Sequence, residues 1–172
     1  QGLKKSGIDD IIFAVGYKGG MVEEYFGDGS RFGIRARYAY EEELLGTAGA
    51  IKNAGKYVTD EQFFVLNGDT FYQMDFGDLS RIQQEKNLEM ALVLRGVPDI
   101  SRYGAARLTD GLLTAFNEKN GNTGAGTING GVYLMKRALL DEIPEGKVSL
   151  ENECIPRWMQ EGRRLGGIVN DG

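Results

Sequence analysis

The sequence contains no histidine, a single cysteine and only three prolines among its 172 residues. Without an imidazole, Ser-His-Asp and Cys-His nucleophile pairs are excluded, and so is a zinc site with histidine ligands. A single cysteine cannot form an internal disulfide, so the cysteine content gives no sign of an oxidising compartment. Cys154 falls on one helical stripe with apolar neighbours, which predicts a small buried hydrophobic residue rather than a nucleophile.

Long apolar runs and clusters of positive charge are also missing. Runs such as residues 11–15 have the length of a strand, whereas a membrane span needs roughly 18 apolar residues. The net charge is −5, and basic residues do not cluster as they would on a surface that binds nucleic acid. No basic and then apolar leader is visible. We therefore expect a cytoplasmic protein without a nucleic-acid or membrane partner.

The remaining composition is that of a globular chain, with 41% hydrophobic and 26% charged residues. This length predicts one domain over residues 1–172, which would bury about 70% of the surface of the unfolded chain. An enzyme without histidine needs a reaction that does not depend on an imidazole. Phosphoryl or nucleotidyl transfer fits, because a phosphate oxygen with a second pKa of about 6 is already an ionised nucleophile.

The pattern along the chain alternates between apolar runs typical of strands and spacings typical of helices. We expect strands at 10–17, 34–40, 62–69, 89–97, 103–108, 112–119, 128–135 and 165–169. Helices are expected at 21–26, 44–58, 75–86, 136–143 and 150–161, with caps at Asp75 and Ser149 and an interruption at Pro156. The predicted fold is α/β, a Rossmann-like mixed but mostly parallel sheet flanked by helices. The turn pair Asp110-Gly111 predicts an antiparallel hairpin within it.

Residues 63–71 run from four apolar side chains directly into Asn67-Gly68-Asp69. A continuous apolar run suggests a strand that is buried on both faces, and ligands bind beyond the carboxyl ends of such strands. A carboxylate there, next to a glycine that permits close approach, suits a hard cation beside a phosphate. The alternative is a simple Asn-Gly turn that Asp69 caps.

Two glycine-containing segments are also candidates for ligand binding. Gly46 and Thr47 stand at the start of a predicted helix, where free amides could meet phosphates; the alternative is a helix start packed closely on the sheet. Asn129 precedes Gly130 and Gly131 inside a predicted strand, which marks either close approach by a ligand or a β-bulge.

One strand end carries a charged pair, Glu118-Lys119. The carboxylate could accept sugar hydroxyls while the ammonium meets a phosphate. The alternative is a solvated ion pair at the end of the strand.

Taken in order, these segments resemble the sugar-phosphate nucleotidylyltransferases, and most closely the branch of mannose-1-phosphate and D-glycero-D-manno-heptose 1-phosphate guanylyltransferases. The resemblance covers essentially the whole chain and rests on residues 41–51, 65–70, 102–104, 116–119, 129–133 and 149–151 with Pro156.

This resemblance implies an enzyme in which a sugar 1-phosphate attacks the α-phosphorus of a nucleoside triphosphate, GTP in this branch, and releases pyrophosphate. The sugar implied is a manno-heptose or a hexose, the product a precursor of lipopolysaccharide, capsule or S-layer glycans, and a homo-oligomer is compatible with it. Asp69 would bind a catalytic Mg²⁺. The implied catalytic residues are Asp69 and Lys119, the nucleotide-binding residues Gly46, Thr47 and Gly68, and the sugar-phosphate-binding residues Thr70, Gly104, Glu118, Lys119, Asn129 and Gly130.

The sequence departs from the family pattern at both ends. It contains neither the glycine-rich triphosphate loop with its first strand nor the second metal-binding aspartate, and Asp171 does not take that role. We therefore expect a domain that is truncated at both ends and incomplete for catalysis as given. The alternative is a non-catalytic regulatory domain that binds sugar nucleotides. A glycosyltransferase of similar fold is less consistent, because no Asp-x-Asp follows a predicted strand.

Overall fold

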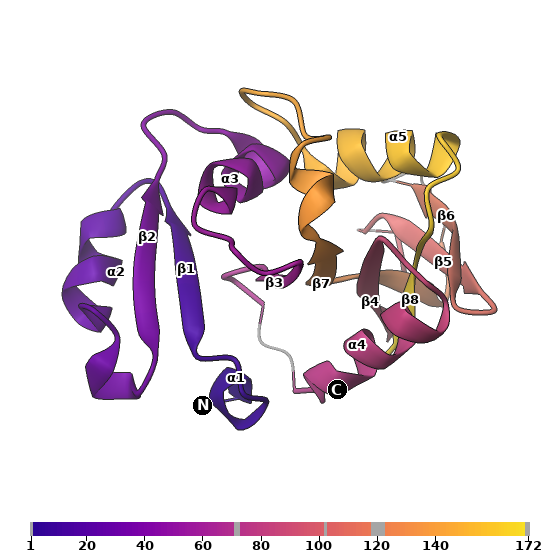
Figure 1. The fold of residues 1–172 in the computed structure, drawn as a ribbon. Helices are drawn as coiled ribbons and strands as arrows, with labels where there is room; N and C mark the ends of the chain where they lie inside the picture. The colour runs from indigo at the N-terminus through magenta and orange to yellow at the C-terminus, as the bar shows by residue number, and fades with distance from the viewer. Residues whose placement is uncertain (1, 71–72, 102, 118–122, 171–172) are drawn as a thin grey trace.

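The computed structural model describes residues 2–70, 73–101, 103–117 and 123–170, and shows an α/β architecture (Figure 1). The strands are β1 (Asp10–Val15), β2 (Arg35–Tyr40), β3 (Gln62–Leu66), β4 (Met90–Val97), β5 (Ala105–Thr109), β6 (Leu112–Asn117), β7 (Gly126–Lys136) and β8 (Leu165–Val169). The helices are α1 (Gly2–Lys5), α2 (Gly19–Phe26), α3 (Gly46–Gly55), α4 (Phe76–Glu85) and α5 (Ile155–Gln160). Short 3₁₀ turns η1 (Ser30–Phe32) and η2 (Arg137–Leu140) and a π turn η3 (Leu150–Cys154) complete the described elements.

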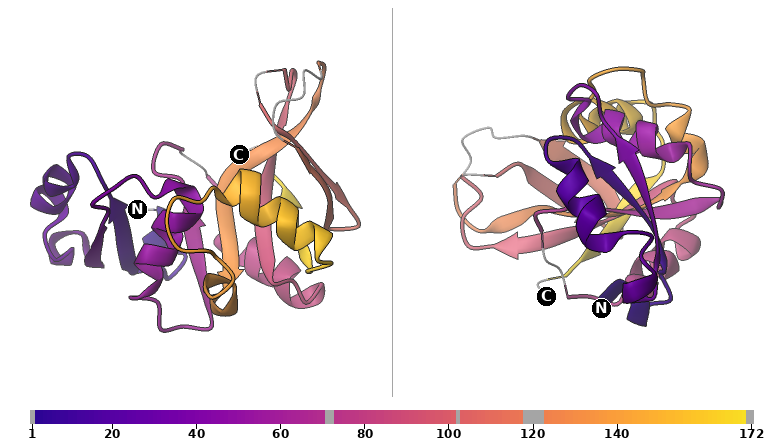
Figure 2. Two further views of the ribbon diagram at one scale, coloured as in Figure 1. Left: turned by 90° about the horizontal axis from the view of Figure 1, so that it is seen from above. Right: turned by 90° about the vertical axis from the view of Figure 1, so that its left-hand side faces the viewer.

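The described strands form two sheets. β1 and β2 pair in parallel, and together with α2 they make up one end of the molecule (Figure 2). The other sheet has six strands in the order β3-β7-β4-β8-β6-β5. Its mixed character is confirmed, but its pairing differs from the mostly parallel ladder that we expected: only β4 and β8 pair in parallel, and every other neighbouring pair is antiparallel. The reason is that β7 inserts between β3 and β4 in the opposite direction.

The central strands β4 and β7 hold the core. Alternate residues of β4 face opposite sides of the sheet, so Met90, Leu92 and Leu94 join one apolar cluster and Ala91 and Val93 join another. Helices α3 and α5 cover the first face with side chains such as Ile51 and Trp158, and α4 covers the second with Phe76 and Leu79. This sheet between two helical layers is the expected α/β arrangement.

Strand β3 is less buried than its apolar sequence suggests. Phe63, Phe64 and Val65 are half-buried and Leu66 is 38% exposed, because β3 pairs only with β7 among the described strands and so lies at an edge. Both faces of β3 contact an apolar cluster, Phe63 and Val65 on one side and Phe64 on the other, but the burial is only partial. An apolar run shows that a strand is buried on at least one face, but it does not distinguish an edge from the centre of a sheet.

Local signals in the sequence locate several element ends correctly. The Asp75 carboxylate caps α4 by accepting from the amide of Gly77, and the Ser149 hydroxyl accepts from the amide of Asn152 at the start of η3. Asp110 and Gly111 both adopt positive φ in the tight β5–β6 turn, as predicted. The helix expected at 136–143 was wrong, since only the 3₁₀ turn η2 forms there. The expected interruption at Pro156 is confirmed, because the π turn gives way to α5 just before it.

None of the helices in the described part of the chain has the length and apolar character to cross a lipid bilayer.

Candidate functional site

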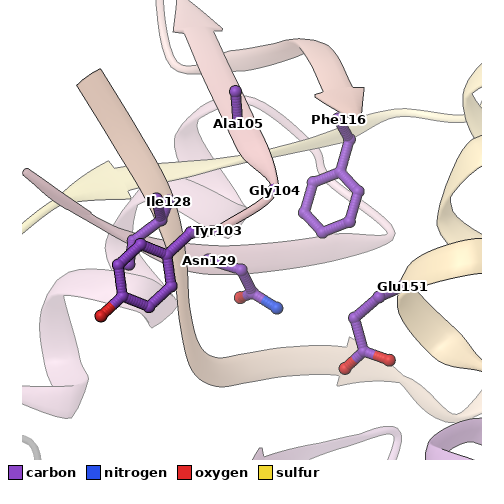
Figure 3. A pocket seen from close by; sticks show the side chains of 7 residues that line it. All are labelled: Tyr103, Gly104, Ala105, Phe116, Ile128, Asn129 and Glu151. Carbon is purple, nitrogen blue, oxygen red and sulfur yellow. The ribbon is translucent and has the colours of Figure 1, made fainter. Parts of the chain in front are cut away.

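A pocket of about 180 Å³ opens between the β5–β6 hairpin, β7 and the π turn (Figure 3). The side chains of Asn129, Phe116 and Glu151 reach it from three different elements. Its complete lining is Tyr103, Gly104, Ala105, Phe116, Ile128, Asn129 and Glu151. The pocket thus combines an aromatic and aliphatic wall with an amide and a carboxylate, a mixture suited to a small polar ligand with an apolar face.

A bulge in β7 places Asn129 in this pocket. Leu92 of β4 pairs with Tyr133 and Leu94 pairs with Asn129, so three residues of β7 lie opposite one residue of β4. Gly131 adopts φ +72° in this bulge, and its carbonyl accepts from the amide of Asn67 at 2.9 Å. A Cβ at Gly131 would lie 2.7 Å from the side-chain nitrogen of Asn67. Gly131 therefore serves both the bulge and a close approach by another segment of the chain.

Asn129 begins a chain of hydrogen bonds that ends at Glu151. Its Oδ1 accepts from the amide of Gly131 at 3.1 Å, and its Nδ2 donates to the Tyr133 hydroxyl. The Tyr133 hydroxyl in turn donates to Glu151 Oε1 at 3.2 Å. Burial raises the pKa of Tyr133 above its usual value, and the negative charge of Glu151 raises it further, so the phenol stays protonated.

Helix α3 also donates a hydrogen bond to the carboxylate of Glu151. The Thr47 hydroxyl donates to Glu151 Oε2 at 2.6 Å and accepts from the amide of Leu150 at 2.7 Å. Gly46 has φ +71°, and its missing side chain lets the start of α3 approach Val148. A Cβ at Gly46 would lie 2.6 Å from the carbonyl oxygen of Val148. We call residues 45–49 with 146–151 the α3 junction.

The α3 junction changes the expected role of the helix start. The amides of Ala48 and Gly49 both donate to the carbonyl of Val148, at 3.0 and 3.3 Å, so they are occupied by the chain itself. Thr47 does not cap the helix; Leu45 takes the N-cap position. The helix start is therefore closely packed, but against residues 146–148 rather than against the sheet, and these two amides are not free to bind phosphate.

Asp69 lies in a turn that follows β3. The amide of Thr70 donates to the carbonyl of Asn67 at 3.3 Å, which closes the turn, and the Thr70 hydroxyl donates to Asp69 Oδ1 at 3.3 Å. Gly68, Asp69 and Thr70 are exposed, and a Cβ at Gly68 would meet nothing within 4 Å. Asn67 links this turn to the bulge through Gly131.

The structure brings some of the predicted site residues together and leaves others apart. Gly104 and Asn129 line one pocket, Gly130 is buried in the bulge beside it, and Thr47 reaches the pocket through Glu151. Gly68, Asp69 and Thr70 do not line it. Glu118 and Lys119 lie outside the described residues. Sequence reasoning assigned no role to Tyr133, Glu151 or Phe116; only their places in the family-like segments could have drawn attention to them.

The described residues contain no group of three or more acidic, cysteine or histidine side chains that could hold a metal by themselves. An exposed single carboxylate such as Asp69 nevertheless suits Mg²⁺, which keeps several waters and is bound through one or two carboxylates together with substrate phosphates.

Sequence comparison identifies the family and the relatives to which this chain is similar. The sequence profile of the nucleotidyl transferase family matches residues 1–172. A D-glycero-alpha-D-manno-heptose 1-phosphate guanylyltransferase of Aneurinibacillus thermoaerophilus is 35% identical over 170 residues, which cover 98% of this chain and 73% of that protein. A mannose-1-phosphate guanylyltransferase of Mycobacterium tuberculosis is 32% identical over 162 residues, 93% of this chain and 45% of that protein.

Among solved structures, HddC from Yersinia pseudotuberculosis complexed with GMP-PN superimposes with a TM-score of 0.82. It is 28% identical, and the match covers 98% of this chain and 73% of HddC. The match therefore spans about three quarters of the Aneurinibacillus protein and of HddC, and less than half of the Mycobacterium protein.

Proposed function

The chain belongs to the nucleotidyl transferase family, and on that basis we propose that its protein transfers a nucleotidyl group from GTP to a sugar 1-phosphate. The sugar is a manno-heptose or a related hexose, and the products are a GDP-sugar and pyrophosphate. The relatives named above are guanylyltransferases of heptose and mannose 1-phosphates, and the related HddC structure contains GMP-PN. We place the reaction in the cytoplasm, where nucleoside triphosphates are made.

The pocket with Asn129 carries this proposal. A carboxamide offers a donor and an acceptor side by side, which suits neighbouring hydroxyls of a sugar. Phe116 and Ile128 supply an apolar wall for the sugar ring. Gly104 lines the same pocket, and Glu118 and Lys119 follow β6 directly in the sequence. We propose that these residues, with Thr70 and Gly130, hold the sugar phosphate, whereas Gly46, Thr47 and Gly68 lie along the nucleotide.

In this reaction a sugar phosphate oxygen forms a bond to the α-phosphorus, and the bond between that phosphorus and pyrophosphate breaks. The nucleophile is already ionised, so the protein contributes positioning and neutralisation of charge. Asp69 would hold a Mg²⁺, which neutralises phosphate charge when bound. Lys119 would place a positive charge beside the phosphate of the sugar.

The direct test is pyrophosphate release by the protein at its natural length, with each common nucleoside triphosphate combined with heptose, mannose and glucose 1-phosphates. We expect turnover to be fastest with GTP and a manno-configured sugar. A control without sugar phosphate measures hydrolysis. Binding of a GDP-sugar without any pyrophosphate release would instead favour the regulatory domain without catalysis, and it would contradict the proposal.

A further inference from the structure

Glu151 accepts hydrogen bonds from two parts of the site at once. Its Oε1 accepts from the Tyr133 hydroxyl, and its Oε2 accepts from the Thr47 hydroxyl at 2.6 Å and from the Ser149 hydroxyl at 3.4 Å. Although Glu151 lines the pocket, both carboxylate oxygens are thus already engaged by the protein. This arrangement points to a role in holding other groups rather than in touching a ligand.

The direction of each hydrogen bond follows from its neighbours. The amide of Gly131 can only donate, so the Asn129 atom that it meets must be the carbonyl oxygen. The Asn129 nitrogen therefore faces Tyr133 and donates to it, and Tyr133 must pass its own hydrogen to Glu151. On the other side, Thr47 accepts from the amide of Leu150 and so donates to Glu151. Both series of hydrogen bonds therefore end at the carboxylate of Glu151.

We propose that Glu151 is a positioning residue that acts through Tyr133 to fix the Asn129 carboxamide in the sugar-phosphate pocket and, through Thr47, ties this pocket to the start of α3. One N–H and one lone pair of the Asn129 carboxamide then remain for vicinal hydroxyls of the ligand. The identity of that ligand rests on the proposed function, whereas the fixed orientation of Asn129 does not depend on it.

Tyr133 is fully buried, so its ring is fixed by packing and only its hydroxyl takes part in this relay. Tyr133→Phe removes that hydroxyl and keeps the ring, so Asn129 loses one of the two hydrogen bonds that orient its carboxamide and keeps only the one from the Gly131 amide. We expect the KM for the sugar 1-phosphate to rise about tenfold, the effect of losing one well-oriented hydrogen bond. The KM for the triphosphate should change less than about twofold. Tyr38→Phe is the matched control, since the Tyr38 hydroxyl also donates a hydrogen bond, to the Gly27 carbonyl.

The double variant Asn129→Ala/Tyr133→Phe separates positioning from a direct role. If Tyr133 acts only through Asn129, the double variant should bind the sugar 1-phosphate no worse than Asn129→Ala alone. A further loss as large as the one that Tyr133→Phe causes in the wild-type protein would overturn the proposal.

A spectroscopic measurement tests the orientation without any substrate. In the ¹⁵N-resolved NMR spectrum, one of the two side-chain amide protons of Asn129 should exchange slowly with water, and Tyr133→Phe should make both exchange fast. Equal exchange in the two proteins would overturn the proposal. If Tyr133→Phe does not fold, Glu151→Leu removes both acceptor oxygens at a similar side-chain volume and should give the same change. If Tyr133→Phe abolishes the slow exchange but the wild-type protein releases no pyrophosphate, the positioning role is supported and the proposed function is refuted.

Discussion

The carboxylates of Glu151, which lines the pocket, and Asp69, which does not, have opposite surroundings. Glu151 accepts from Thr47, Tyr133 and Ser149, and it lies where the α3 junction meets the bulge of β7. Asp69 is exposed in the turn after β3 and accepts from Thr70 alone among the described hydrogen bonds. A carboxylate whose oxygens are occupied fixes the geometry of its neighbours, whereas an open carboxylate is available to a cation or a phosphate-bound metal.

The backbone near Glu151 is closely packed, whereas the backbone near Asp69 has open space around it. At the α3 junction, glycines let two segments approach within contact distance, and adding a Cβ at Gly46 or Gly49 would bring it within 2.6 and 2.4 Å of a carbonyl oxygen. In the turn after β3, a Cβ at Gly68 would meet nothing within 4 Å. Substitutions at the junction should therefore change stability, and substitutions in the turn should change only activity.

The largest effect is expected from Asp69→Asn, measured as pyrophosphate release by the protein at its natural length. Loss of the charge proposed to bind a metal should lower kcat by about 100-fold to 1,000-fold, since a bound metal contributes several kcal/mol to transition-state stabilisation. The free energy of unfolding should change by less than about 0.5 kcal/mol, because the side chain is exposed. Asp60→Asn, another exposed aspartate just before β3, is the matched control. Unchanged pyrophosphate release by Asp69→Asn would refute the metal assignment.

Gly46→Ala should have the largest effect on stability. The new Cβ combines a positive φ with a contact at 2.6 Å to the backbone of Val148, so we expect a loss of about 3 kcal/mol in the free energy of unfolding. Gly162→Ala is the control for backbone strain alone, since Gly162 has φ +73° and open space around it, and it should lose about 1 kcal/mol. Chemical denaturation measures both. Equal losses would show that the α3 junction is not tightly packed.

Gly131→Ala should lower the free energy of unfolding by less than Gly46→Ala and by more than Gly162→Ala. Its Cβ would meet the side chain of Asn67 at 2.7 Å, but a side chain can move where a backbone carbonyl cannot. We expect a loss of about 2 kcal/mol in the free energy of unfolding, of which about 1 kcal/mol comes from the positive φ. Gly68→Ala, in open space, should lose less than about 0.5 kcal/mol. If Gly131→Ala costs no more than Gly162→Ala, Asn67 does not restrain the bulge.

Local chemistry explains which parts of this structure could be predicted from the sequence. The caps at Asp75 and Ser149 and the Asp110-Gly111 turn each depend on residues only a few positions apart, and each is confirmed. The strand expected at residues 89–97 is confirmed as β4, whose apolar residues 90–94 are buried.

The rest depends on partners that lie far apart in the sequence. Thr47 was expected at the start of a helix that could meet phosphates, but its hydroxyl bonds to Leu150 and Glu151, more than 100 positions away. Two of the amides at the start of α3, those of Ala48 and Gly49, donate to Val148, which also lies about 100 positions away. Glu151 has no local feature that marks it out, since its role comes from Tyr133 and Thr47. The places of Glu118 and Lys119 in the site stay predictions.

The smallest effect is expected at Asp10, a carboxylate outside the site that is fixed by cations rather than by hydroxyls. Partial burial would raise the pKa of Asp10, but hydrogen bonds from Arg37 and Arg35 outweigh it and hold the pKa below its usual value. The pairing therefore stabilises the fold above about pH 4, and this contribution is lost as the pH falls through the lowered pKa. Asp10→Asn should lose less than about 1 kcal/mol at neutral pH, since the ion pairs are partly exposed. Denaturation between pH 2 and pH 7 should show a flatter acid limb for the variant than for the wild type. An acid limb of the same slope in both proteins would mean that Asp10 titrates alike in the folded and unfolded chains.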